Sequence, residues 1–289
     1  MRGNAMKPAI DFYCYHRYFG EIYPGLEQDP GTRITLDEAL HRAVSLGVAG
    51  VSIETCFLPE FSARDADALG RKLDRLGLER IWAWGHLSGL GSGGAPERLR
   101  DLRDHIEIAA RVGARVMRIC CGSRLTRPAE WSRHKAALLP LLHEAVAQAR
   151  AHEVVLAIEN HIDFLADELV ELIETIGSPW LGVCLDTGNT LRMLEDPLQA
   201  ALKLAPYARA THVKDVRARA GDPRSFAFWP SVPLGQGLID LPAIFAALRA
   251  HGYDGLLALE IDYLDPAYTS DAQAMAQSLD YMRGLLARA

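Results

Sequence analysis

Cysteine is scarce in this sequence, and long apolar runs are missing. Five of the 289 residues are cysteines, and none forms a CxxC pair. An odd number without that spacing indicates reduced thiols in a cytoplasmic protein rather than a disulfide framework. No stretch approaches the about 18 apolar residues of a transmembrane helix, and no apolar segment follows residues 1–8 as in a signal peptide. We therefore expect neither secretion nor a membrane partner.

An excess of positive charge is missing as well. The chain has 31 lysines and arginines against 37 aspartates and glutamates, which gives a net charge of −6. A protein that binds a polyanion usually concentrates basic residues on one face, so we do not expect a nucleic-acid partner. Hydrophobic residues make up 49% of the chain, which is enough for the large core of a globular protein.

One helix pattern recurs along the chain. Thr35 is followed three residues later by Glu38, and an apolar stripe then runs to Gly47, as in a capped amphipathic helix that ends at glycine. Comparable segments follow at about 62–76, 96–112, 131–151, 165–176, 196–205, 241–251 and 270–287.

Short apolar or β-branched runs with the length of strands alternate with these helices. They lie at about 9–15, 50–54, 80–85, 115–120, 154–159, 181–185, 210–213 and 256–261. Eight β–α repeats in about 280 residues predict a single α/β domain, a (β/α)₈ TIM barrel over residues 1–289, with residues 1–6 as a flexible extension. The alternative is an open doubly wound sheet, but no GxGxxG or GxxxxGK[ST] motif follows the first strand.

The longest irregular connection, at about 215–237, is rich in aromatic residues. Long loops in compact domains tend to be functional, so we expect it to fold over the barrel mouth.

Four consecutive predicted strands end in a residue type that binds metals: Glu159, Asp186, His212 and Glu260. A carboxylate at the end of an apolar strand costs free energy unless it is solvated, paired or bound to a metal. In a barrel these side chains converge at the C-terminal mouth, where barrel enzymes have their active sites. Each alone could pair with a local Lys or Arg, but together they predict one divalent metal ion, Mn²⁺, Mg²⁺, Co²⁺ or Zn²⁺.

Several segments resemble the xylose-isomerase-like TIM-barrel superfamily of sugar isomerases and epimerases, which also includes AP endonuclease family 2. They are Ile158-Glu159-Asn160-His161, Cys184-Leu185-Asp186-Thr187-Gly188-Asn189, His212-Val213-Lys214-Asp215, Pro233-Leu234-Gly235-Gln236-Gly237 and Leu259-Glu260. The resemblance implies that the four residues bind one metal ion and that Glu159 and Glu260 also exchange protons with a substrate carbon. Asn189 stands where some epimerases of the superfamily carry a histidine.

The reaction implied by this resemblance is isomerisation or epimerisation of a keto- or hydroxy-sugar through an ene-diolate. The same enolate would serve a lyase or decarboxylase that acts on a keto-sugar acid, and release of CO₂ or water would distinguish the two. An endonuclease of the endonuclease IV type would need further histidines and a basic rim. A non-catalytic binding protein would be expected to have lost a ligand. The resemblance also implies a homodimer or homotetramer.

Other strand ends supply candidate substrate contacts: Glu54, His86, His161, Lys214 and Arg217. Lys214 and Arg217 could neutralise a carboxylate or phosphate of the substrate, although Lys214 could instead pair with the ligand carboxylates. A structural hydrogen bond is the alternative for Glu54 and His86. Arg118 lies within the fourth strand and should point inward, where it could form a salt bridge with Glu159 or Glu54.

Overall fold

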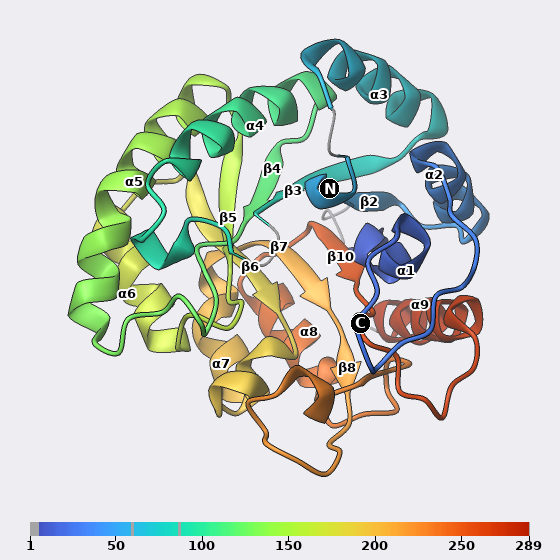
Figure 1. Cartoon of the computed structure of the whole chain (residues 1–289). Coiled ribbons are helices and arrows are strands. Elements are labelled where there is room, and N and C mark those ends of the chain that lie inside the picture. Colours follow the sequence, from blue (N-terminus) through green and yellow to red (C-terminus); the bar gives the residue numbers. More distant parts are fainter. Residues whose placement is uncertain (1–5, 59–60, 86–87, 289) are drawn as a thin grey trace.

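The computed structural model describes residues 6–58, 61–85 and 88–288. Within these residues, parallel strands close into an eight-stranded barrel with helices on its outside (Figure 1). Its strands are β1 (Lys7–Asp11), β2 (Gly50–Glu54), β3 (Glu79–Trp84), β4 (Val116–Ile119), β5 (Val155–Glu159), β6 (Leu181–Asp186), β7 (Ala208–Val213) and β10 (Leu256–Leu259), and β10 closes the ring between β7 and β1. The predicted TIM barrel is therefore confirmed.

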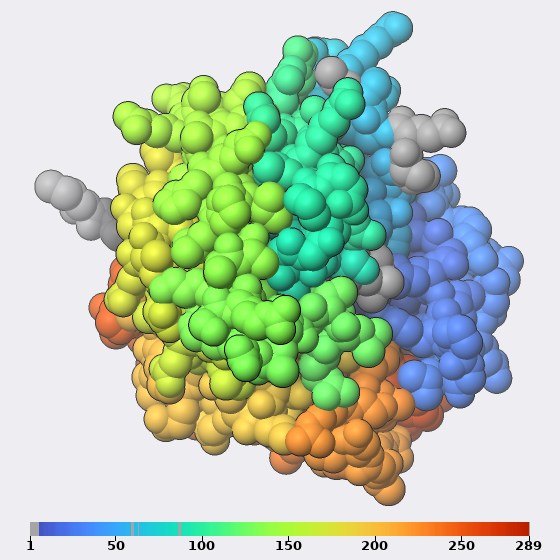
Figure 2. All heavy atoms as spheres, turned by 60° about the vertical axis from the view of Figure 1, so that its left-hand side comes forward, coloured from blue at the N-terminus to red at the C-terminus, as the bar shows by residue number. Residues whose placement is uncertain are grey.

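The outer helices begin and end close to the predicted positions. They are α2 (Leu36–Ser45), α3 (Ala63–Leu76), α4 (Arg98–Val112), α5 (Trp131–Ala151), α6 (Ala166–Ile176), α7 (Pro197–Leu204), α8 (Leu241–Ala250) and α9 (Asp271–Ala287). The predicted capping box of Thr35 and Glu38 is present at the start of α2. Figure 1 shows these helices around the strands, and in Figure 2, which brings the left-hand side of Figure 1 forward, the atoms of the green and yellow segments cover that side of the molecule. No helix within the described ranges is long and apolar enough to cross a membrane.

The first strand is shorter than predicted. β1 ends at Asp11, and the chain then forms a 3-10 helix, Phe12–Tyr15, followed by α1 (His16–Phe19). The carboxylate of Asp11 accepts a hydrogen bond from the backbone N–H of Tyr13 at 2.7 Å, which stabilises this turn. The prediction of a strand over residues 12–15 is therefore wrong. Met6, expected in a flexible extension, is instead buried in the core beside β1.

The interior of the barrel explains where the polar strand ends lie. Small buried residues pack together inside it: Ala9, Ala157, Cys184, Ala210 and Ala258. Because strand residues alternate between the two faces of a sheet, the residue two positions further along the chain also faces inward. Those residues are Asp11, Glu159, Asp186, His212 and Glu260, and all of them are buried. The strand period thus places five ionisable side chains at one end of the barrel.

The long connection after β7 contains a small antiparallel hairpin of β8 (Asp215–Val216) and β9 (Ser231–Val232). The carboxylate of Asp215 accepts backbone hydrogen bonds from Gly235 and Gly237 at 2.9 Å and from Ile239 at 3.1 Å. A Cβ atom on Gly237 would lie 2.1 Å from Oδ1 of Asp215, so this close approach requires glycine. Residues 224 and 226 of the loop line the cavity at the barrel mouth, as predicted.

Candidate metal centre and active-site cavity

The four predicted ligands lie together at the C-terminal end of the barrel. Ligand atoms of Glu159, Asp186 and His212 all lie within 4.8 Å of one another. Oε2 of Glu260 lies 3.3 Å from Nδ1 of His212. Each of the four residues is at most 5% exposed. The strands bring one imidazole and three carboxylates into a single buried cluster.

The segment after β6 positions two of these carboxylates. Oδ1 of Asp186 accepts hydrogen bonds from the backbone N–H groups of Gly188 and Asn189, each at 2.8 Å. The side-chain amide of Asn189 donates to Oε1 of Glu159 at 2.9 Å. One oxygen of each carboxylate is therefore held by the chain. The other oxygen of each contacts a cation, since Oε2 of Glu159 lies 2.7 Å from Nε of Arg118 and Oδ2 of Asp186 lies 3.0 Å from Nζ of Lys214. Asn189, the departure noted in the sequence, serves here as a partner of Glu159.

Asp11 orients the imidazole of His212. Oδ2 of Asp11 lies 3.4 Å from Nε2 of His212, whereas Nδ1 lies 3.7 Å from Oε2 of Glu159 and 3.3 Å from Glu260. A carboxylate on one side of a ligand histidine sets the tautomer and directs the other nitrogen toward the metal position. The sequence reasoning missed Asp11 because it continued the first strand to residue 15. The signal available was a buried Asp at the end of an apolar strand.

Two buried cations compensate the carboxylates. Arg118, which points inward as expected, lies 2.7 Å from Glu159 and 3.1 Å from Glu54. Nζ of Lys214 lies 3.0 Å from Asp186 and 2.8 Å from Glu260. Burial alone would raise the carboxyl pKa values, but Arg118 and His212 hold the pKa of Glu159 below its usual range, and Lys214 and His212 do the same for Glu260. Both glutamates are therefore ionised.

The donor set fits a divalent cation. Oδ2 of Asp186, Oε2 of Glu260 and Nδ1 of His212 are buried without a hydrogen bond. Such atoms are costly unless a cation approaches them. The ammonium of Lys214 contacts oxygens of Asp186 and Glu260 and is a stand-in for part of that positive charge. Three oxygen ligands and one nitrogen ligand suit Mn²⁺, Mg²⁺, Co²⁺ or Zn²⁺.

A cavity of about 520 Å³ opens above this cluster. Such a volume is usual for sites that bind small molecules. Its lining includes acidic, basic and aromatic side chains from several βα loops: Tyr13, Tyr23, Ser88, Arg118, Cys120, Ser123, Arg124, Leu125, Glu159, His161, Ile162, Asn189, Arg192, Lys214, Arg224, Phe226, Glu260 and Asp262.

The predicted substrate contacts divide into three groups. His161 and Lys214 line the cavity, and Nδ1 of His161 lies 3.1 Å from the carbonyl oxygen of Gly122. Glu54 lies behind Arg118 and Arg217 is turned toward Tyr268, so neither is among the lining residues. His86 lies outside the described residues. Burial raises the pKa of Glu54 to about 8, and the charge of Arg118 partly opposes this shift.

Three further cavity residues were missed by the sequence reasoning: Arg124, Arg192 and Arg224. They lie in loops without a hydrophobic period, so no pattern indicates which way they point. A weak signal was available, since each falls in a segment that follows the C-terminal end of a strand, where barrel active sites lie.

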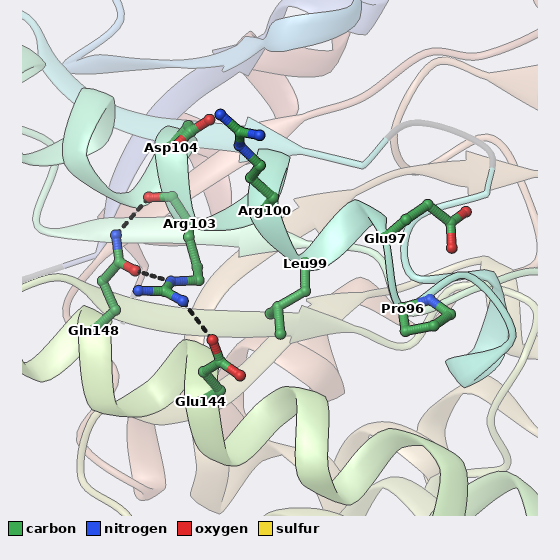
Figure 3. A pocket seen from close by; sticks show the side chains of 8 residues that line it. All are labelled: Pro96, Glu97, Leu99, Arg100, Arg103, Asp104, Glu144 and Gln148. Carbon is green, nitrogen blue, oxygen red and sulfur yellow. Dashed lines mark hydrogen bonds and ion pairs between the residues drawn. The ribbon is translucent and has the colours of Figure 1, made fainter.

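A second cleft, of about 450 Å³, lies on the outer surface between α4 and α5 (Figure 3). Its polar groups pair with one another across the two helices. Arg103 donates to the side chains of Gln148 and Glu144, and the amide of Gln148 donates to the carbonyl oxygen of Arg103 at 2.7 Å. These bonds join α4 to α5, and none of the residues that line this cleft belongs to the buried cluster at the strand ends.

A closed parallel barrel with a buried carboxylate–imidazole cluster at its C-terminal mouth belongs to the class of (β/α)₈ barrels, whose active sites lie at that end. Within that class, the chain belongs to the family of xylose isomerase-like TIM barrels, whose model matches residues 40–285.

The relatives of this chain are named for several different activities. L-ribulose-5-phosphate 3-epimerase UlaE of Salmonella paratyphi C is 25% identical over 195 residues, which cover 66% of this chain and 64% of the relative. The 3-oxo-isoapionate decarboxylase of Pectobacterium atrosepticum is 26% identical over 111 residues, 38% of this chain and 40% of the relative. These matches span less than two thirds of the relatives' length.

Among solved structures, the fold of this chain is similar to that of the IOLI protein, whose crystal structure contains a zinc atom. The TM-score is 0.74 at 17% identity, with 98% of this chain and 99% of the other covered. At this identity the similarity shows the shared fold.

Proposed function

We propose that this protein is a divalent-metal-dependent sugar isomerase or epimerase, with Glu159 and Glu260 as its acid–base pair. The observation that carries the proposal is the convergence of Glu159, Asp186, His212 and Glu260 from four strand ends into one buried cluster. The relatives, which include an L-ribulose-5-phosphate 3-epimerase, support a sugar substrate. The zinc atom of the similarly folded IOLI protein supports a metal site.

The buried side chains would have two roles, binding of the metal ion and proton transfer. Glu159, Asp186, His212 and Glu260 would hold the ion, which when bound polarises the carbonyl oxygen of the substrate and makes the adjacent C–H more acidic. Glu159 and Glu260 are ionised, so either can accept the proton from that carbon. Asn189 holds Oε1 of Glu159, and Oε2, which also lies 2.7 Å from Nε of Arg118, would accept the proton.

The route by which the proton returns would decide the product. Return to the same carbon from the other glutamate inverts the centre, which is epimerisation. Return to the neighbouring carbon moves the carbonyl group, which is isomerisation. His161 and Lys214, which line the cavity, would contact substrate oxygens. Lys214 also keeps Glu260 ionised between proton transfers.

A second candidate function is decarboxylation of a keto-sugar acid through the same enolate. The relative named 3-oxo-isoapionate decarboxylase favours it. The carboxylate would then leave as CO₂, and the proton delivered by a glutamate would take its place on the carbon. Release of CO₂ from keto-sugar acids distinguishes this reaction from one in which the mass of the substrate is conserved.

The first test is metal dependence. The purified protein should contain about one divalent ion per chain, and a chelator should abolish activity that the added ion restores. Exchange of solvent deuterium into a panel of ketoses and keto-sugar acids measures the activity, because it detects C–H cleavage without knowledge of the product. Full activity after removal of the ion would contradict the proposal.

The second test replaces one glutamate. Glu260→Gln should lower the exchange rate by about 10²–10⁴-fold and leave the far-UV circular dichroism unchanged. Asp262→Asn is the matched control, because Asp262 also pairs with Lys214, at 2.8 Å, but lies outside the ligand cluster. The exchange rate of the control should stay at least about ten times higher than that of the Glu260 variant. Equal losses in the two variants would refute the assigned role of Glu260.

A further inference from the structure

Three arginines of the cavity have no carboxylate partner. Arg124 follows β4, Arg192 lies in the 3-10 segment Asn189–Met193 after β6, and Arg224 lies between β8 and β9. Within residues 6–58, 61–85 and 88–288, ion pairs occupy Arg118 and Lys214 at the cavity and Arg217 and Arg219 in the loop, but none of these three. The three residues come from different βα loops and line one cavity.

Arg192 is the most informative of them. It is partly buried, its Nε is withdrawn from solvent without a hydrogen bond, and its guanidinium lies over the ring of Phe226, 5.3 Å from the centroid. Burial lowers its pKa, and the charge of Arg124 lowers it further. The acidic residue that acts on it most strongly is Asp262, which is already bound to Lys214 at 2.8 Å. An unpaired guanidinium of this kind is costly unless a ligand supplies the anion.

The charges of the cavity are separated along its depth. Glu159 and Glu260 are buried at its floor, and each has a cationic partner there, Arg118 or Lys214. Arg124 and Arg224 are exposed at its rim. In Figure 2 the green and orange segments, which contain these two loops, meet on one side of the molecule. The floor suits a cation, whereas the rim has an excess of positive charge.

We propose that Arg192, together with Arg124 and Arg224, binds an anionic group of the substrate, either a phosphate ester or a carboxylate, while the buried cluster holds the reacting carbons. This assignment rests on the proposed function, and it adds the class of substrate. The planar guanidinium donates paired hydrogen bonds to such oxyanions. Arg217, which the sequence suggested for this role, donates to Tyr268 at 3.3 Å and lies 3.8 Å from Asp265.

The first experiment compares substrates that differ only in charge. The rate of deuterium exchange is measured as kcat/KM for ketoses, their terminal phosphate esters and the corresponding keto-sugar acids. The wild-type protein should prefer one anionic form over the neutral sugar by at least about tenfold, which is what a hydrogen bond to a charged group provides. A preference for the ester identifies phosphate, and a preference for the acid identifies carboxylate.

Arg192→Gln should remove this preference. Its kcat/KM should fall by about 10–100-fold for the anionic substrate and by less than about threefold for the neutral sugar. Arg217→Gln is the matched control, since it removes an arginine outside the cavity, and it should keep the preference. Arg124→Gln, at the exposed rim, is a second variant that tests the site if Arg192→Gln does not fold. Equal use of neutral and anionic sugars by the wild-type protein would overturn the assignment.

The second experiment needs no turnover. Binding of inorganic phosphate to the protein as purified is measured by calorimetry, and Arg192→Gln should weaken it by at least about tenfold while Arg217→Gln does not. Binding of phosphate through Arg192 without deuterium exchange on any substrate would refute the proposed function but support the anion site. Exchange on neutral sugars with unchanged phosphate binding in Arg192→Gln would refute the anion site and leave the proposed function intact.

Discussion

The floor and the rim of the cavity each contain an arginine, and the two differ in how their charge is balanced. Arg118, at the floor, is 4% exposed and pairs with Glu54 and Glu159. Arg192, nearer the rim, is partly buried and has an aromatic ring beside it, and none of the residues that the structure describes forms an ion pair with it. The charge of Arg118 is balanced by carboxylates of the protein, whereas the charge of Arg192 is available to a ligand.

The difference predicts unequal losses of stability, and the loss at the floor is the largest expected effect. Arg118→Met would leave Glu54 and Glu159 buried without their cation, and loss of one partner from a buried pair costs about 3–5 kcal/mol. Arg192→Met breaks no ion pair, so its free energy of unfolding should change by less than about 1 kcal/mol. Urea denaturation of both variants measures these changes. Similar losses of stability would remove the distinction between floor and rim.

A second prediction concerns the floor alone. Asp11→Asn keeps the shape of the side chain but removes the charge that orients His212. Loss of such a partner typically lowers metal affinity by about 10–100-fold. Glu27→Gln is the control, because Glu27 pairs with His16 at 3.0 Å in the same N-terminal segment, away from the ligands. Metal titrations of both variants test the role of Asp11, and equal dissociation constants would mean that Asp11 is structural only.

A third prediction concerns the dependence of metal affinity on pH. Burial raises the pKa of Asp186 to about 7, although Lys214 opposes the shift. Burial would lower the pKa of His212, but Cys184, Glu260 and Glu159 raise it well above the usual range. A metal ion must displace the proton that each of these two ligands carries. Above pH 7 only His212 of the two is protonated, so the metal affinity should fall by about tenfold for each unit by which the pH decreases.

Below pH 7 Asp186 is protonated as well, so the slope should steepen toward about a hundredfold per unit. Calorimetric titrations with the metal between pH 6 and pH 8, in buffers of different ionisation enthalpy, count the protons released. Affinity that stays constant over this range would show that neither ligand is protonated in the metal-free floor.

The floor could be predicted from the sequence to a greater extent than the rim. Glu159 and Asp186 end apolar strands, His212 is the second-last residue of one and Glu260 directly follows one. The period of a strand fixes which face each residue occupies. The same period placed Arg118 inside the barrel. The helices were equally predictable, because capping residues such as Thr35 and left-handed glycines such as Gly113 mark their ends.

Other residues could not be predicted because tertiary contacts decide their positions. β1 stops at Asp11, where the side chain bonds to the backbone N–H of Tyr13, and the apolar run that follows has the composition of a strand but forms a 3-10 turn. Arg192 lies in a 3-10 segment whose direction depends on packing against Phe226, which is 34 positions further along the chain. Neither contact leaves a local pattern in the sequence.

Asp215 holds together the two ends of the long connection after β7. It lies in β8, near the start of the connection, and its carboxylate accepts hydrogen bonds from the backbone N–H groups of residues 235, 237 and 239, near the end. The intervening segment, with Arg224 and Phe226, is therefore a closed unit that enters and leaves the barrel at one fixed point. Such a unit can be replaced by another segment of the same end-to-end distance without a change to the barrel strands. Replacement of the segment between β8 and β9 should change which substrates this scaffold accepts and leave the residues at the strand ends untouched.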